Sequence, residues 1–185
     1  MNWIALAALA ATAAYGQTVD QRRENQQDRI AQGIASGQLT AGETTRIEGQ
    51  EAGVNRQIHQ DRAANGGALT PAERRQVNGE QNRLSGEIYR DKHNAAMTNF
   101  RGEVGGRQEL QQQRIAQGVR SGSLTAGETA RLEGKEAAVN HEVRADRAQN
   151  GGTLTPHERR QVNGQQNKLS GQIYRDKHNA ARQPK

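Results

Sequence analysis

The chain of 185 residues has no cysteine, a net charge of +6 and only 3% aromatic residues. The lack of cysteine excludes disulfides, a thiol nucleophile and thiolate metal sites. Basic and acidic residues are interspersed, and proteins that bind single-stranded nucleic acid need stacking aromatic side chains, so no nucleic-acid partner is expected.

The segment 1–16 is typical of a secretory signal peptide. It reads MNWIALAALAATAAYG, an apolar run in which Ala14 and Gly16 occupy the two positions that a signal peptidase inspects. We therefore expect cleavage after Gly16 and a periplasmic or secreted protein. The run is shorter than the ~20 apolar residues that span a bilayer, and no later segment approaches that length. No transmembrane segment is expected after removal of the signal.

The remaining chain, residues 17–185, is poor in large apolar residues. Leu, Ile, Val and Phe make up 24 of its 169 residues, about 14%, below the ~20% expected of an ordinary globular domain. A fully buried aliphatic side chain stabilises folding by about 1.5–3 kcal/mol, whereas ordering a residue costs about 1–2 kcal/mol. The composition predicts thin apolar seams between long helices, and favours a protein partner or self-association.

Most of the chain consists of two copies of one sequence. Residues 29–96 align without a gap to residues 114–181, and 50 of the 68 positions are identical. A shorter repeat lies inside each copy, because the pattern Gly-x-Leu-Thr-x-x-Glu that starts at Gly37 recurs at Gly67. The second copy repeats this pair of patterns. Such self-similarity predicts the tandem duplication of one structural unit.

Each of these patterns predicts the start of a helix. A Thr followed three residues later by Glu is a capping box, in which each side chain hydrogen-bonds to the backbone N–H of the other residue. Pro71 and Pro156 stand at the first helical position of two of the starts, where a missing N–H costs nothing. Apolar residues then recur with a period of 3.6. In chain order the expected helices span residues 20–34, 40–63, 70–97, 107–120, 125–148 and 155–181.

These elements predict an all-α protein made of two three-helix units with capped turns. The units would span residues 17–98 and 107–185, and the Gly-rich segment 99–106 would link them. Glycines also fall inside the predicted helices at equivalent positions, as at Gly49 and Gly134. A mid-helix glycine costs about 1 kcal/mol against alanine, so these positions mark either close helix crossings or loose packing.

Two of the turns resemble the calcium-binding loop of the EF-hand family. In that family a helix leads into a loop with Asp and Asn ligands and a glycine, and a Glu ends the loop in the next helix. The matching residues are Asp61, Asn65 and Glu73 in the first copy, and Asp146, Asn150 and Glu158 in the second. Each segment has one position more than the EF-hand loop, and Ala stands at the third ligand position. The resemblance implies a calcium-responsive module with these residues as metal ligands.

A second resemblance lies in the sequence Leu-Thr-Pro-x-Glu-Arg-Arg, which starts at Leu69 and again at Leu154. It is similar to the L-T-x-x-Q motif of small periplasmic helical stress proteins, although Glu stands in place of Gln at every copy. This resemblance implies a periplasmic chaperone or stress protein.

No catalytic pattern is present in the sequence. It has no Gly-x-Ser-x-Gly elbow, no His-Glu-x-x-His pair and no phosphate loop. The densest polar clusters read Tyr-Arg-Asp-Lys-His-Asn from Tyr89 and from Tyr174, and their Asp and His lie two residues apart, so they do not share a helix face. We therefore expect a non-enzymatic protein without a resident cofactor, in a structural or partner-binding role. The alternatives are the calcium-responsive module and the periplasmic chaperone.

Overall fold

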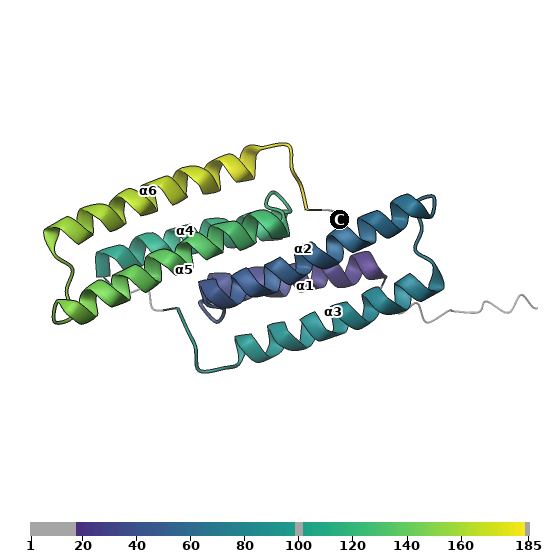
Figure 1. Ribbon diagram of the computed structural model, residues 1–185, viewed down its shortest axis with the longest axis horizontal. Coiled ribbons are helices and arrows are strands. Elements are labelled where there is room, and N and C mark those ends of the chain that lie inside the picture. The colour runs from purple at the N-terminus through teal and green to yellow at the C-terminus, as the bar shows by residue number, and fades with distance from the viewer. Residues whose placement is uncertain (1–17, 99–101, 184–185) are drawn as a thin grey trace, which may run out of the picture.

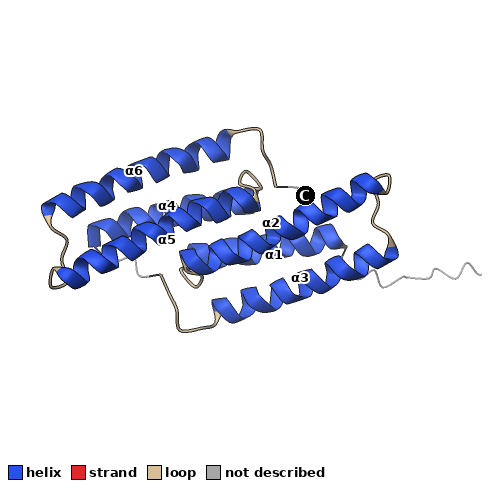
Figure 2. Cartoon of the chain, in the orientation of Figure 1, coloured by secondary structure: helices blue, strands red, loops and turns tan. Residues whose placement is uncertain are grey.

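The computed structural model describes residues 18–98 and 102–183, and within these ranges the chain is all-α, without a strand (Figure 2). This confirms the predicted fold class. The helices are α1 (Val19–Ser36), α2 (Ala41–Ala64), α3 (Pro71–Lys92), α4 (Gly102–Ser121), α5 (Ala126–Gln149) and α6 (Pro156–His178). The predicted signal peptide, residues 1–16, lies outside the described residues. In the part of the chain that the structure describes, no helix is long and apolar enough to cross a membrane.

The helix starts are set by capping boxes. Thr40, Thr70, Thr125 and Thr155 are the N-caps of α2, α3, α5 and α6, as the sequence predicts. In each box the Thr hydroxyl accepts from the backbone N–H of the Glu three residues later, and the Glu carboxylate accepts from the Thr N–H. Each box thus satisfies two N–H groups that would otherwise lack partners at the helix end.

The predicted end of the third helix is wrong, because α3 ends at Lys92 rather than at residue 97. Beyond this point the chain turns back over the first half. The Asn94 side chain donates to Glu43 Oε1 at 2.7 Å, and the Thr98 N–H donates to the Gly37 carbonyl oxygen at 3.0 Å. These bonds are made across the turn between α1 and α2, so the chain leaves the axis of α3.

The sixth helix also ends earlier than predicted, at His178 rather than at residue 181. The physical reason is the same, since Asn179 donates to Glu128 Oε1 at 2.7 Å and the Gln183 N–H donates to Gly122 O at 3.0 Å. Residues 102–106 of the segment predicted as a linker belong to α4, which begins at Gly102.

The four helices α1, α2, α4 and α5 form the centre of the molecule, and α3 and α6 lie along its opposite outer sides (Figure 1). The most extensive helix–helix contacts join the two halves, because α2 packs against α5 and α1 packs against α4. The outer helices each cover their own half, α3 on α1 and α2, and α6 on α4 and α5. The bounds of α2 and α5 coincide when the two copies are aligned, so equivalent segments of the copies meet at the centre.

One apolar core passes through both halves. Its buried side chains come from all six helices and from the α1–α2 and α4–α5 turns: Ile30, Ala31, Ile34, Leu39, Ile47, Leu84, Ile88, Ile115, Ala116, Val119, Leu124, Leu132, Leu169 and Ile173. Two smaller clusters extend it, one around Ile58 and Val77 in the first half and one around Val139 and Val162 in the second. The two halves are therefore parts of one body with a shared core.

Candidate functional site

The structure places the predicted calcium ligands of the first copy at the turn between α2 and α3. Asp61 lies in the last turn of α2, Asn65 is the C-cap of that helix, and Glu73 lies in the first turn of α3. Asn65 Nδ2 donates to both carboxylate oxygens of Glu73, at 2.9 and 3.0 Å, and to the Asp61 carbonyl oxygen at 2.8 Å. The amide of Asn65 thus presents its N–H groups, rather than its oxygen, to the carboxylate of Glu73.

The second copy repeats this arrangement at the turn between α5 and α6. Asn150 Nδ2 donates to the two carboxylate oxygens of Glu158, at 2.9 and 3.0 Å, and to the Asp146 carbonyl oxygen at 2.9 Å. The hydrogen bond from the Thr155 backbone is the main reason why the pKa of Glu158 is lowered. Among the residues that the structure describes, no group of three His, Asp or Glu side chains is placed to hold a metal ion. Calcium binding by these loops stays a prediction.

The most unusual polar residues lie where α2 meets α5, and no known motif marks them. Glu48 and Glu51 belong to α2, and Glu133 and Glu136 occupy the equivalent positions of α5. Each of the four is at most 1% exposed, although a carboxyl group is almost never fully buried unless it is paired. We call these four residues the glutamate cluster.

Only two hydrogen bonds reach the glutamate cluster from the flanking helices within the described residues. Gln27 of α1 donates to Glu48 Oε2 at 3.2 Å, and Gln112 of α4 donates to Glu133 Oε2 at 2.9 Å. The second oxygen of each of these glutamates, and both oxygens of the other two, have no hydrogen-bond partner in that part of the chain. The Oε1 atoms of Gln27 and Gln112 are unpartnered there as well. A buried acceptor left without a donor costs about 1–3 kcal/mol, so the cluster as a set of bare acceptors is unfavourable.

Burial dominates the electrostatics of the cluster because it penalises the charged form of each carboxyl group. It raises the pKa of Glu51 and of Glu136 to about 7, and that of Glu133 to about 8. The pKa of Glu48 is raised well above its ordinary value by burial and then by the neighbouring carboxyl of Glu51. Glu51, Glu133 and Glu136 therefore take up and release protons near neutral pH.

The two halves differ in the charge that faces the cluster. Arg23 of α1 is only 2% exposed, and its positive charge acts against burial to lower the pKa of Glu51. Gln108, a neutral side chain, stands at the equivalent position of α4 and donates to Asn140. The cluster therefore has one cation on its first side and neutral amides on its second.

A sequence signal for the cluster exists but is weak. Glu51 follows the apolar Ile47 by four residues, so it shares that residue's helix face. The same Glu-x-x-Glu spacing recurs unchanged in the second copy beside Leu132. Period alone predicts that Glu51 points inward, but it does not say that α5 covers the same face with a second pair of carboxyl groups.

A different pair of equivalent residues lies on the surface. Tyr89 of α3 and Tyr174 of α6 are 60% and 59% exposed. Each ring stacks on the histidine four residues later, with ring centroids 4.2 Å apart, and the histidine Nδ1 is within hydrogen-bond distance of the tyrosine carbonyl oxygen. We define the tyrosine patches as Tyr89, Arg90 and His93 at the C-terminal end of α3, and as Tyr174, Arg175 and His178 at the C-terminal end of α6.

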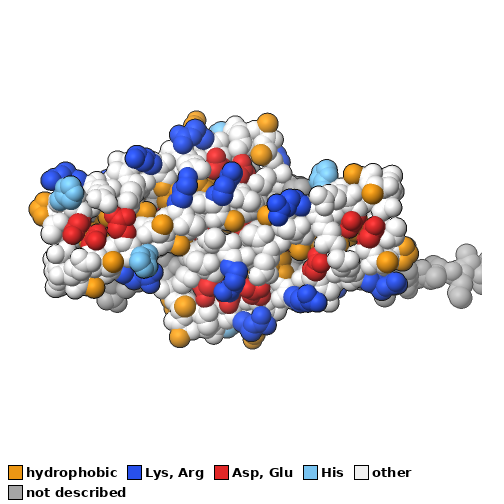
Figure 3. Space-filling view, in the orientation of Figure 1, with side chains coloured by type: hydrophobic (Ala, Val, Ile, Leu, Met, Phe, Trp, Pro, Cys, Tyr) orange, Lys and Arg blue, Asp and Glu red, His pale blue; other side chains and the backbone are white. Residues whose placement is uncertain are grey.

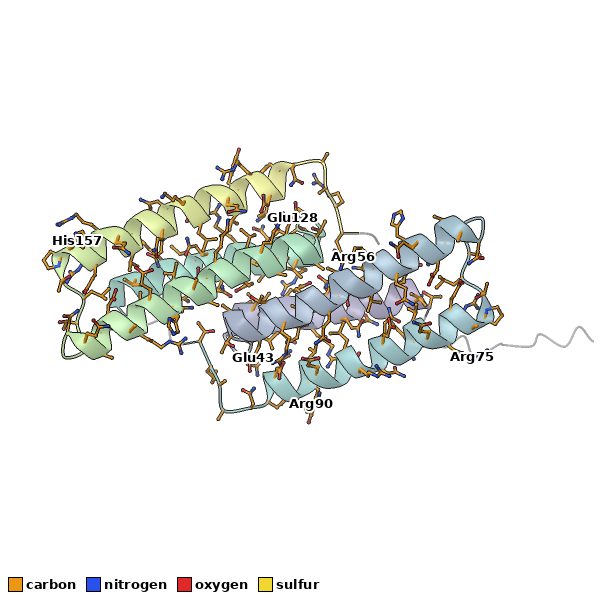
Figure 4. The ribbon with its side chains drawn as sticks, viewed as in Figure 1. Glu43, Arg56, Arg75, Arg90, Glu128 and His157 are labelled. Atoms are coloured by element: carbon orange, nitrogen blue, oxygen red, sulfur yellow. The ribbon has the colours of Figure 1, made fainter. Side chains whose placement is uncertain are left out.

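Basic side chains accompany the tyrosines on the outer helices. Figure 4 shows Arg75 and Arg90 on the side of α3 that faces away from the centre of the molecule. Neither side chain makes a hydrogen bond or an ion pair within the part of the chain that the structure describes. On the face seen in Figure 3, Lys and Arg side chains are spread among acidic and neutral ones and do not form one continuous basic area. On this face the basic side chains therefore lie apart from one another.

No protein-family model, no curated protein and no solved structure matches this chain.

Proposed function

We propose that this protein is a non-enzymatic binding protein that presents one recognition surface twice, once on α3 and once on α6. The observation that carries the proposal is the identity of the exposed tyrosine patches in the two copies. The partner is a protein, and the expected setting is the periplasm or the outside of the cell.

The two outer helices have diverged less than the inner helices that they cover. Residues 71–92 and 156–177 are identical at 18 of 22 positions, whereas residues 41–64 and 126–149 are identical at 14 of 24. Buried positions need to keep their packing, whereas exposed positions change freely unless a function keeps them. The four differences, at positions 72, 80, 83 and 87, are all exposed or half-buried, whereas residues 88–92 around Tyr89 are unchanged, which supports a role for that part of the exposed face.

The large apolar side chains on the surface also support a recognition role for the tyrosine patches. Four of them are exposed within the described residues, and two of these are Tyr89 and Tyr174, which are equivalent. The other two are Met97 and Leu110. Their equivalents in the other copy are polar: Arg182 aligns with Met97, and Asn25 aligns with Leu110. Only the tyrosines are kept exposed in both copies, which separates them from incidental surface residues.

The chemistry of the patches suits recognition of a protein. Tyrosine and arginine are enriched among the residues that contribute most to protein–protein binding, because they combine a large apolar surface with hydrogen-bonding groups. The stacked histidine restricts the tyrosine ring, so less side-chain entropy is lost on binding. Two equal patches on one body allow one molecule to hold two copies of the same partner.

Site-specific photo-crosslinking tests the proposal directly. The photoreactive residue p-benzoylphenylalanine replaces Tyr89 or Tyr174 in turn, and the cells that make the protein are irradiated. The matched controls carry the same residue in place of Met97 or Leu110. We expect the same crosslinked protein from positions 89 and 174, and no such product from the two controls.

The adducts are identified by mass spectrometry. A shared adduct at both tyrosine positions supports a surface that is used twice, and an adduct with this chain itself identifies a second copy as the partner. Different adducts at the two positions, or yields equal to those of the controls, contradict the proposal.

A further inference from the structure

The glutamate cluster is a set of titratable side chains that the proposed recognition surface does not use. It lies on the contact between α2 and α5, which is one of the two main contacts between the halves. Any charge that develops in this contact therefore changes the stability of the packing between the two copies.

The groups that face the cluster cannot neutralise four carboxylates. From α1 come Gln27 and one cation, Arg23, which already binds Asp20 at 2.9 Å. From α4 comes the neutral Gln112, hydrogen-bonded to Glu133. With all four carboxyl groups ionised, the contact would hold four negative charges against one shared positive charge. Buried charges of this kind are strongly unfavourable without partners.

Protons resolve both the charge and the missing donors. A protonated carboxyl is neutral and gains one O–H donor while it keeps acceptor capacity. Each proton thus adds a donor to a contact in which several buried acceptors lack one. The same atoms that are unfavourable as bare acceptors become able to form hydrogen bonds across the contact.

We infer that protons hold the two halves together: the carboxyl groups of the glutamate cluster are protonated in the folded protein, and their ionisation as the pH rises loosens the contact between α2 and α5. The contact between α2 and α5 is therefore controlled by protons and is most stable at mildly acidic pH.

The sign of the pH dependence follows from the pKa values. The pKa of an unfolded glutamate is near 4.5, whereas burial raises the pKa of Glu51 and Glu136 to about 7 and that of Glu133 to about 8. The stabilisation is fully present below the unfolded value and is lost as the pH rises through the folded values. Over that interval the folding equilibrium constant falls about tenfold per pH unit for each carboxyl that is protonated in the folded state only.

Urea unfolding of the whole chain at a series of pH values tests the inference. We expect the folding constant of the unchanged protein to fall by about tenfold or more for each pH unit between 5 and 7. The variant Glu51→Gln/Glu136→Gln is neutral at both positions at every pH, so its profile should be flatter. The control Glu24→Gln/Glu109→Gln changes two equivalent exposed glutamates of α1 and α4 and should leave the slope unchanged.

A second measurement keeps the test decisive if the variant does not fold. Carbon-13 labelling of the glutamate carboxyl groups lets NMR follow each titration in the unchanged protein. We expect carboxyl resonances that titrate near pH 7–8. The inference is overturned if every glutamate titrates below about pH 5, the range of exposed carboxyl groups. It is also overturned if the unchanged protein is as stable at pH 8 as at pH 5, because ionisation of the cluster would then have no effect on the contact.

Discussion

At the scale of single residues, two glycines lie directly against a leucine of the core. A Cβ atom built on Gly33 would lie 2.6 Å from Leu39 Cδ1, and one built on Gly118 would lie 2.6 Å from Leu124 Cδ1. Each leucine is fixed by the hydrogen bond from its own N–H to the carbonyl oxygen of that glycine, at 3.0 and 3.1 Å. A side chain at either glycine must therefore displace a fixed core residue.

The substitution Gly33→Ala is expected to lower the free energy of unfolding by about 1–3 kcal/mol, because the added methyl group overfills the core. Gly49→Ala is the matched control. No atom lies within 4 Å of a Cβ built on Gly49, so that change should raise the free energy by up to about 1 kcal/mol through better helix propensity. Urea unfolding followed by circular dichroism measures both, and equal stabilities would refute the close packing of Gly33.

The capping carboxylates predict a loss of stability in acid. Hydrogen bonds from the backbone of Thr70 and of Thr155 are the main reason why the pKa values of Glu73 and Glu158 are lowered. Their contribution is present above the unfolded pKa, near 4.5, and is lost as the pH falls below it. The variant Glu73→Gln/Glu158→Gln keeps an uncharged capping acceptor, so thermal unfolding between pH 3 and 5 should depend less on pH than in the unchanged protein. An unchanged dependence would show that other groups cause the acid loss.

Local chemistry explains which single-residue features the sequence predicts. A capping box involves residues three apart, so the pair Thr70 and Glu73 can be recognised in the sequence without knowledge of the fold. The burial of Glu48 and Glu133 depends on which helix covers which face, and no local pattern contains that information. Whether Gly49 lies at a close helix crossing or in loose packing also depends on neighbouring helices rather than on the local sequence. In the structure the space beside Gly49 is open.

At the scale of elements, the turns between paired helices are held by side-chain amides. Asn65 donates its side-chain N–H groups to the carboxylate of Glu73. Both oxygens of that carboxylate therefore already have a hydrogen-bond donor. A capped turn of this kind is complete without an ion. The calcium prediction and the capped-turn geometry therefore lead to different results in solution.

Calcium is expected to leave the thermal midpoint of residues 17–185 unchanged, because Asn65 and Asn150 already satisfy the two carboxylates. Circular dichroism on heating, with millimolar calcium and then with a chelator, measures this. Asn65→Ala/Asn150→Ala is the informative variant, since it removes the competing donors and should lower the midpoint in both conditions. A rise of several degrees with calcium in the unchanged protein would establish the EF-hand-like loops as ion sites.

The ends of elements are harder to predict than their starts. The starts of α2, α3, α5 and α6 have caps in the sequence, whereas α3 ends where Asn94 contacts Glu43, a residue far back in the chain. The Gly-rich segment 99–106 reads as a linker because glycine disfavours helices. Packing of α4 against α1 overrides that preference from Gly102 onward.

At the scale of the whole molecule, the shared core fixes the geometry of the two tyrosine patches. Because α1, α2, α4 and α5 pack as one centre, α3 and α6 are held on opposite outer sides (Figure 1). A partner that is itself joined or multimeric would be bound at both patches at once, which raises the effective concentration of the second contact. Removing one patch, by Tyr89→Ala, should therefore weaken binding of such a partner far more than twofold. Binding of the partner to the immobilised protein measures this, and the double Tyr89→Ala/Tyr174→Ala variant gives the background signal.

The two copies form a single body through the contacts of α2 with α5 and of α1 with α4. The most direct test is sedimentation combined with circular dichroism on residues 17–98 expressed alone. In that fragment the surfaces that normally meet the second half are exposed, and a second copy of the fragment offers nearly the same residues. We predict that the fragment is helical only as a dimer and loses its helix content on dilution. A monomer that keeps its helices and unfolds cooperatively at low micromolar concentration would contradict the claim, because each copy would then be a domain in its own right.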